Sequence, residues 1–424
     1  MYMSVNPSSS ELPLRAPLRR RSYLGLDLTL DAGSDSPRVA EVDADSPAAH
    51  AGLMPGDLLI SVAELPITNL DSARSVVRSA PTEEPSVVVI ERDGARCELT
   101  VQARPMPIET LPSGRVELSE VMLPDHRLRA IWTFPEARGP FPAIWMLPGA
   151  AWLSEERPIA PGGALLELVR GLTAAGFATL RVDRSGLGDS EGPLCTETDL
   201  NAELAGWQAA LAHLCAHPEV RQDRVFVYAR SLGGMLAPLV VKGFAPRAVA
   251  VWGTSARRWS RAMLEGARRQ HALAGTTGPA LERILAAQER LHHWVYRAAL
   301  TPERAFEQEP ELRSLESLNF RGGQLYRRSA AFFQQLERVD VAQAWRELPC
   351  PLLALHGTSD WLSQLEDTIE IAELAPRGAY LELTGIDHMM HARASVEEAF
   401  SEPFTGTFCP KALEALIAFF RAQL

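Results

Sequence analysis

The chain has 424 residues, 46% of them hydrophobic, which predicts two or three domains with large cores. A formal net charge of −11 argues against a nucleic-acid ligand, because phosphate contacts need clustered lysine and arginine. No apolar run approaches the roughly 20 residues that a spanning helix needs, so no membrane span is expected. The five cysteines have no paired spacing typical of a metal site or a disulfide framework, so we expect them to be reduced.

The chain opens with residues 1–21, which contain three consecutive serines and the basic cluster Arg19-Arg20-Arg21. A signal peptide needs an apolar core, and this stretch has none. The pattern therefore predicts a disordered lead-in and a cytoplasmic protein.

Residues 22–104 combine short strand patterns with one convincing helix, unlike the rest of the chain. Within them, residues 46–62 run from a helical turn through a Pro-Gly-Asp turn into an apolar strand, and on this pattern the module resembles the PDZ family. The resemblance implies that amides near Leu24, Gly25 and Leu26 receive a peptide C-terminal carboxylate while the peptide adds as a strand at the sheet edge. Such modules also serve as internal packing partners or lids, and the sequence leaves both roles open.

A proline-bearing stretch, residues 105–112, follows the module and predicts a semi-rigid linker that holds it against the next domain. Residues 113–424 then alternate apolar strand patterns with helical ones, which predicts an α/β domain with a mostly parallel sheet and helices on both faces. A long, largely helical excursion at about residues 254–347 predicts a cap over that sheet.

A serine lies between a strand pattern and a helix pattern in this domain. The apolar run 225–228 predicts a buried strand, and a helix pattern begins directly after Ser231. A strand, a sharp turn and a helix form a nucleophile elbow, which lifts the serine hydroxyl above the sheet. Ala229 takes the first glycine position of Gly-x-Ser-x-Gly, and Gly233 keeps the second. Alone the pattern is as typical of an ordinary turn, so the interpretation depends on partner residues.

Two later loops provide those partners. Asp360 follows a buried strand pattern at 351–355, and His388 follows the last strand pattern at 379–383. Both loops lie at the carboxyl edge of the predicted sheet, where open parallel sheets bind ligands. An imidazole must take the proton of a serine nucleophile, and a carboxylate must fix the tautomer of the imidazole. Ser231, Asp360 and His388 therefore predict a catalytic triad.

Other residues compete for these roles. His391 is one helical turn from His388 and is a less favoured base, and Asp387 is a less favoured carboxylate because it adjoins the base in sequence. His356 is interpreted as a residue that stabilises its loop. The sequence does not decide whether Arg230 bonds within the site or covers its rim.

With the three residues in order, the chain resembles the α/β-hydrolase superfamily from residue 115 to residue 424. The resemblance implies that residues 147–151 form the oxyanion loop, so that the amides of Ala150 and Leu232 stabilise a tetrahedral intermediate. Pro148 stands where histidine is more common in that loop. Residues 183–190 match the Asp-x-x-Gly-x-Gly-x-Ser turn of the family, which is usually structural.

The function that the resemblance implies is that of a serine hydrolase acting on a small-molecule or peptidyl ester, thioester or amide through an acyl-enzyme. A serine peptidase of the oligopeptidase type is the alternative. An adaptor with an inactive hydrolase domain, working through its PDZ groove, is a hypothesis of another class, and the three triad residues argue against it. The sequence shows no metal cluster, phosphate loop or dinucleotide fingerprint, so no metal or cofactor is predicted.

Overall fold

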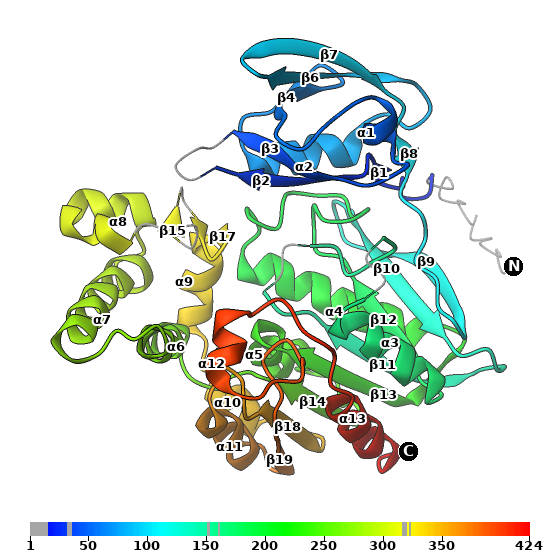
Figure 1. Ribbon diagram of the computed structural model, residues 1–424. Helices are drawn as coiled ribbons and strands as arrows, with labels where there is room; N and C mark the ends of the chain where they lie inside the picture. Colours follow the sequence, from blue (N-terminus) through cyan, green and yellow to red (C-terminus); the bar gives the residue numbers. More distant parts are fainter. Residues whose placement is uncertain (1–15, 32–35, 151–152, 160–161, 316–319, 322–323) are drawn as a thin grey trace, which may run out of the picture.

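The computed structural model describes residues 16–31, 36–150, 153–159, 162–315, 320–321 and 324–424. A small β-rich domain lies above a larger α/β domain, and the cap helices lie to one side of the larger domain (Figure 1). The small domain has the PDZ arrangement and the large one the α/β-hydrolase arrangement, as the sequence predicted.

The PDZ domain is built on one antiparallel sheet with its own core. Its strands, in spatial order, are β2 (Leu26–Leu30), β3 (Pro37–Val42), β4 (Leu58–Val62), β6 (Ser86–Arg92) and β7 (Ala95–Val101), with β5 (Leu65–Pro66) beside β4. The helices are α1 (Pro47–His50) and α2 (Leu70–Ser79). Asp93 and Gly94 both have positive φ, as a two-residue hairpin turn between β6 and β7 requires. The order leaves β2 at the edge of the sheet.

The two ends of the PDZ domain pair with each other and lie on the hydrolase domain. β1 (Ser22–Tyr23) pairs with β8 (Arg104–Pro105). Just before β1, Leu18 is buried, and Arg20 Nη1 and Arg21 Nη1 lie 2.8 and 2.9 Å from Glu156 Oε2. Both arginines also contact Asp189. Residues 16–21 of the expected lead-in therefore pack on the hydrolase domain, and residues 1–15 lie outside the described residues.

The predicted linker is also attached to the hydrolase domain. Glu109 is buried, and its Oε1 lies 2.7 Å from Nη2 of the buried Arg181. The amide of Arg157 donates to the other oxygen of Glu109 at 2.9 Å. These contacts, together with the arginine clamp formed by Arg20 and Arg21 on Glu156 and Asp189, explain why the PDZ domain sits against its neighbour.

Within the described residues, the hydrolase domain is built on an eight-stranded sheet. β9 and β10 run antiparallel to their neighbours, and the other strands pair in parallel. The spatial order is β19 (Gly378–Leu383), β18 (Leu352–Gly357), β14 (Ala248–Trp252), β13 (Val220–Arg230), β11 (Phe141–Leu147), β12 (Ala178–Val182), β10 (Arg127–Phe134), β9 (Arg115–Met122).

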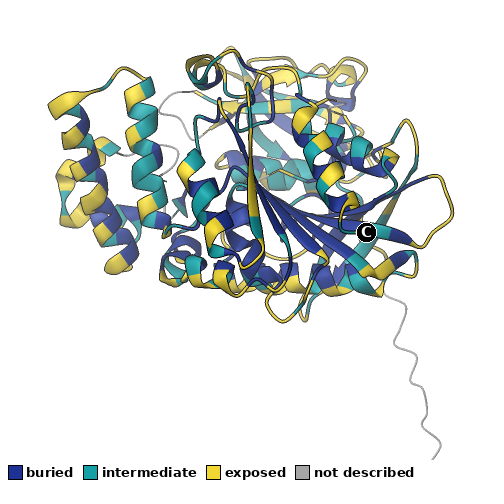
Figure 2. Ribbon diagram, turned by 90° about the horizontal axis from the view of Figure 1, so that it is seen from below, coloured by how far each residue is buried: buried dark blue, intermediate teal, exposed yellow. Residues whose placement is uncertain are grey.

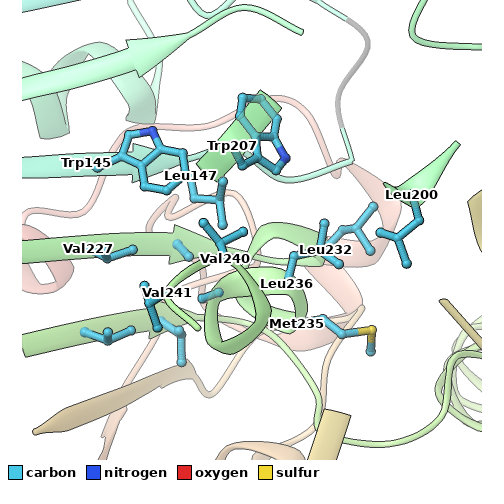
Figure 3. Close-up of a cluster of buried hydrophobic side chains, with 14 of the residues drawn as sticks. Trp145, Leu147, Leu200, Trp207, Val227, Leu232, Met235, Leu236, Val240 and Val241 are labelled. Carbon is cyan, nitrogen blue, oxygen red and sulfur yellow. The ribbon is translucent and has the colours of Figure 1, made fainter. Parts of the chain in front are cut away.

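Helices cover both faces of this sheet, and its central strands are buried between them, whereas the edge strands β9 and β19 are more exposed (Figure 2). In β13, Val225 and Val227 pack into the core on one face, whereas Phe226 and Tyr228 pack into the core on the other. Figure 3 shows the first core, where Trp145 and Val227 of the sheet lie near side chains of the helices. The first face is covered by α4 (Leu200–Ala216) and α5 (Leu232–Val240), and the second by α3 (Ala164–Ala174) and α13 (Lys411–Arg421).

The segment interpreted as a cap lies between β14 and β18. Its elements are α6 (Trp259–Leu273), α7 (Gly278–His292), η1 (His293–Arg297), α8 (Pro302–Gln308), η2 (Pro310–Leu315), β15 (Phe320–Arg321), β16 (Gln324–Leu325), β17 (Arg328–Ser329), α9 (Ala330–Arg338) and α10 (Val341–Arg346). The rings of Trp259 and Phe333 stack with centroids 4.4 Å apart, and both are buried. These two cap aromatics are core residues.

The rest of the domain is α11 (Leu365–Leu374), between β18 and β19, and α12 (Val396–Ser401), after β19. In the described part of the chain, none of the helices has the length and apolar content to cross a bilayer. The same residues include no group of three or more histidine, cysteine or acidic side chains placed to hold a metal ion.

Candidate active site

Ser231 occupies a sharp turn between β13 and α5. Its φ is 52° and its ψ is −126°, a strained conformation for a residue with a side chain. Glycine makes the turn possible, because a Cβ at Gly233 would lie 2.2 Å from the carbonyl oxygen of Pro148. The amide of Ser231 donates to the carbonyl of Trp252 at 2.8 Å, which ties the turn to the end of β14. The strand, turn and helix order predicted from the sequence is present.

Asp360 and His388 form a hydrogen-bonded pair. Asp360 follows β18 and His388 follows β19, and His388 Nδ1 lies 2.8 Å from Asp360 Oδ2. The other carboxylate oxygen accepts the amides of Leu362 at 2.7 Å and Ser363 at 2.8 Å. Ser363 Oγ donates to Oδ2 at 2.6 Å. Because Nδ1 is hydrogen-bonded to Asp360, Nε2 is the imidazole nitrogen that remains for proton exchange.

The pair stabilises its own charged forms against burial. Burial favours the neutral acid of Asp360, but the charge and hydrogen bond of His388 prevail and hold the pKa of Asp360 down at about 2. Burial also favours neutral His388, and there the carboxylate of Asp360 prevails, so the pKa of His388 is raised above 6.5. The site therefore holds an ionised carboxylate beside an imidazole that titrates above its usual range.

The carboxyl end of β14 connects the serine turn with this pair. Trp252 accepts the amide of Ser231 at 2.8 Å and donates its indole Nε1 to the carbonyl of His388 at 2.9 Å. A Cβ at Gly253 would lie 2.9 Å from His388 Cε1 and 3.0 Å from Asp360 Oδ2. Glycine therefore leaves the space that the imidazole occupies. The three predicted triad residues converge on one strand end.

The competing residues have other partners. Asp387 accepts Arg393 Nε at 2.8 Å and the amide of His391 at 2.8 Å. His391 Nδ1 lies 3.6 Å from the carboxylate of Asp387. His356 is buried within β18, where burial is the largest influence and lowers its pKa. Asp360, and not Asp387, holds the imidazole of His388.

The predicted oxyanion loop packs against the serine turn. A Cβ at Gly149 would lie 3.3 Å from Ser231 Cβ, so the loop backbone runs beside the nucleophile position. Ala150 follows in this loop, and Leu232 is the first residue of α5. The next loop residue, Ala151, lies outside the described residues. The two backbone amides predicted as oxyanion donors thus belong to neighbouring segments.

Some site residues are visible only in the structure. Arg230 turns to the buried Glu155, with Nη2 3.3 Å from Oε2. Asp183, in the predicted structural turn, accepts Ser154 Oγ at 2.8 Å, and burial raises its pKa to about 6. Ser363 lies three residues after Asp360, and this Asp-x-x-Ser spacing is a signal that could have found it. No sequence signal pairs Arg230 with Glu155.

The predicted carboxylate loop of the PDZ domain lies at the start of β2. Gly25 has a φ of 75°, and a Cβ there would lie 2.1 Å from Ser46 Cβ, so the loop requires glycine. The carbonyl of Leu24 accepts the amide of Ala48 at 2.8 Å, and Leu26 begins the edge strand. β2 and α2 lie on the side of the PDZ domain that faces the hydrolase domain (Figure 1).

The helix α2 also touches the hydrolase domain. Arg78 donates to the carbonyl of Gly186, and a cavity of about 70 Å³ lies between α2 and the segment around residues 186–196. Arg74 and Asp71 line the α2 side of this cavity. One wall of the expected peptide groove is therefore part of the contact between the domains.

A family model described as "Serine aminopeptidase, S33" matches residues 161–395, which is more than half of the chain. The chain belongs to the serine aminopeptidase S33 family. It is a hydrolase of the α/β-hydrolase superfamily, and a PDZ-domain model matches residues 38–92. The matched hydrolase segment of this S33 protein includes Ser231, Asp360 and His388.

Curated proteins match over short stretches. A putative zinc metalloprotease of Rhizobium meliloti is 46% identical over 63 residues, which are 15% of this chain and 17% of that protein. A probable periplasmic DegP-like serine endoprotease of Rickettsia conorii is 34% identical over 64 residues, 15% of this chain and 13% of that protein. The chain thus spans less than a fifth of the length of these relatives.

Solved structures align with much of the chain at low identity. Est1E from Butyrivibrio proteoclasticus with bound ferulic acid aligns over 72% of this chain and 99% of its own, with 16% identity and a TM-score of 0.47. An esterase from Thermogutta terrifontis aligns over 73% and 99%, with 16% identity and a TM-score of 0.41.

Proposed function

We propose that the chain is a serine hydrolase that cleaves an ester, thioester or amide through an acyl-enzyme. Ser231 is the nucleophile, His388 the general base and acid, and Asp360 the carboxylate that orients His388. The observation that carries the proposal is the convergence of the strained Ser231 turn and the Asp360–His388 pair on Trp252 and Gly253.

The proposed reaction follows from the chemistry of these groups. His388 Nε2 takes the proton of the Ser231 hydroxyl as its oxygen attacks the acyl carbon. Asp360 stabilises the imidazolium that forms, and the amides of Leu232 and Ala150 stabilise the oxyanion. The imidazolium then protonates the leaving group, which departs and leaves the acyl group on Ser231. Water attacks this ester by the same route and frees the serine.

The proposed substrate class is an acyl compound whose leaving group is an alcohol, thiol or amine. A panel of nitrophenyl esters of increasing acyl length, matching thioesters and aminoacyl arylamides would distinguish among them. A preference for aminoacyl arylamides would favour the peptidase alternative, for which the description of the matched family model is the specific support.

A fluorophosphonate probe tests the mechanism. We expect it to label Ser231, and Ser231→Ala to lose both the label and about a millionfold in kcat, the loss found for triad nucleophiles. Ser255→Ala is the matched control, since Ser255 is buried nearby and donates to Asp367 at 2.9 Å. It should keep the label. If Ser231 is not labelled in the folded wild-type protein, the hydrolase proposal is wrong and the adaptor hypothesis is favoured.

We also propose that the PDZ groove binds a peptide C-terminus, as a partner or as part of a peptidyl substrate. The edge strand β2 and the loop of Leu24, Gly25 and Leu26 support this role. Gly25→Val should abolish binding of C-terminally free peptides in a fluorescence anisotropy screen. Gly52→Val is the control, since Gly52 has a φ of 81° with nothing within 4 Å of its added Cβ. Equal losses in both variants would mean that only folding of the domain had changed.

A further inference from the structure

We propose that Arg184 is a positioning residue that orients the peptide unit between Gly149 and Ala150 for oxyanion binding. This inference rests on the proposed function. Its basis is one hydrogen bond between the turn after β12 and the loop after β11, in which the guanidinium of Arg184 donates from Nη2 to the carbonyl of Gly149.

The direction of the Ala150 amide follows from peptide geometry. The carbonyl of Gly149 and the N–H of Ala150 belong to the same planar trans unit, so they point to opposite sides. Arg184 holds the carbonyl on one side of the loop, which turns the N–H to the other side. Gly149 itself lies beside the nucleophile, since its added Cβ would be 3.3 Å from Ser231 Cβ.

Such a lock is needed because the loop contains glycine at this point. A glycine permits rotations of the adjoining peptide planes that other residues resist. A flipped unit would present a carbonyl oxygen, and not an amide, to the developing oxyanion. The close approach of Pro148 to Gly233 fixes the path of the loop, but it does not fix the rotation of the unit that follows.

Sheet register explains why Arg184 reaches this carbonyl. β11 and β12 are parallel neighbours, with Trp145 opposite Leu180. Gly149 and Arg184 each lie four residues after this pair and two residues after the end of their strand, so both follow the carboxyl edge of the sheet. The predicted structural turn thus delivers a long cationic side chain next to the oxyanion loop.

A buried network keeps Arg184 in place. Its side chain is 3% exposed, its Nε lies 3.2 Å from Glu203 Oε1, and its guanidinium carbon lies 5.4 Å from the ring centre of Trp207. The other oxygen of Glu203 pairs with Arg328 of the cap strand β17. When Arg184 is substituted, Glu203 still has Arg328 as a cationic partner. The buried carboxylate is therefore not left unpaired, and we expect the fold to tolerate the change.

The test compares Arg184→Lys and Arg184→Met with the wild type on an activated ester. Lysine keeps a charge near Glu203 but lacks the planar fork that reaches two acceptors. We expect kcat to fall about 10- to 100-fold in both variants with KM within about threefold, since an oxyanion donor acts in the transition state. Affinity for an alkylboronic acid, which forms a tetrahedral serine adduct, should fall by the same factor as kcat/KM.

The matched control is Arg328→Lys, which changes the other cation on Glu203 without touching the loop. It should lower the melting temperature about as much as Arg184→Lys and keep kcat within about twofold. Endpoint labelling by a fluorophosphonate counts the competent sites in every variant, so misfolded protein does not imitate a loss of kcat.

Two results would overturn the role of Arg184: wild-type kcat per labelled site in both Arg184 variants, or a fall in kcat with unchanged boronic acid affinity. Failure of the proposed function looks different, since it appears in the wild type as an unlabelled Ser231 and in Ser231→Ala as retained hydrolysis.

Discussion

Two loops at the same edge of the hydrolase sheet each contain a carboxylate with 0% exposure. Asp360, after β18, pairs with the imidazole of His388, whereas Asp387, after β19, pairs with the guanidinium of Arg393. Arginine keeps its proton in proteins, but imidazole exchanges one near neutral pH. The partner, and not the depth of burial, decides whether a buried carboxylate can assist proton transfer or only hold a loop.

The largest effect is expected from Asp360→Asn. The amide of asparagine favours the wrong tautomer of His388, so kcat on an activated ester should fall about 10³- to 10⁴-fold, as for the equivalent change in a well-studied triad. Steady-state kinetics on the folded variant would check this. A loss below about tenfold would remove Asp360 from the triad.

Asp387→Asn should act mainly on stability. It removes the carboxylate charge 2.8 Å from Arg393 Nε and leaves the buried guanidinium only Glu398, whose Oε1 lies 3.7 Å from Nη1. Breaking a buried ion pair costs about 3 to 5 kcal/mol. Thermal melts should show a clear fall in Tm, while kcat per labelled site stays within about tenfold of the wild type. If kcat falls further here than in Asp360→Asn, the roles of the two carboxylates are exchanged.

The pH profile should separate the two carboxylates again. The general base must be neutral, and the pKa of His388 is raised above 6.5, so kcat/KM should fall as the pH drops through a midpoint above 6.5. Burial is the largest influence on His388 and lowers its pKa, so without the charge of Asp360 the midpoint should move to lower pH. Asp387→Asn should move it much less. Rates measured from pH 4 to pH 9 would show the order of the three midpoints.

The smallest effect is expected from Ser363→Ala. It removes the hydroxyl that donates to Asp360 Oδ2, but the amides of Leu362 and Ser363 still hold Oδ1. One net hydrogen bond corresponds to about a two- to tenfold loss in kcat. A loss near that of Asp360→Asn would mean that the hydroxyl, and not the amides, orients the carboxylate.

The positions of the three proposed triad residues could be predicted because each follows a strand that is visible in the sequence, although β19, the strand before His388, is largely exposed. Parallel strands bring their carboxyl ends to one edge, so Ser231, Asp360 and His388 had to meet there. The sequence favoured Asp360 over Asp387 because Asp387 adjoins the base, but it did not contain the side-chain directions that show which partner each carboxylate has. The contact with Arg393 supplied that information.

Contacts across long sequence distances could not be predicted. The segment before β1 has no apolar core, so a disordered lead-in was expected. In the structure, Glu156 and Asp189 pair with Arg20 and Arg21, and Arg129 donates to the carbonyl of Leu18. Arg184 was part of a turn interpreted as structural. Its bond to Gly149 depends on the register between β11 and β12, which local patterns do not fix.

The arginine clamp also implies an order in which the two domains assemble during synthesis. Glu156 and Asp189 stand 136 and 169 residues after Arg20, and a ribosome that adds about 5 to 20 residues per second needs on the order of ten seconds to make that stretch. The PDZ domain closes its own ends with β1 and β8 and has its own core, so it is complete before its acidic partners emerge. The hydrolase domain therefore assembles beside a finished neighbour, and the nascent PDZ domain carries two uncompensated arginines until that moment.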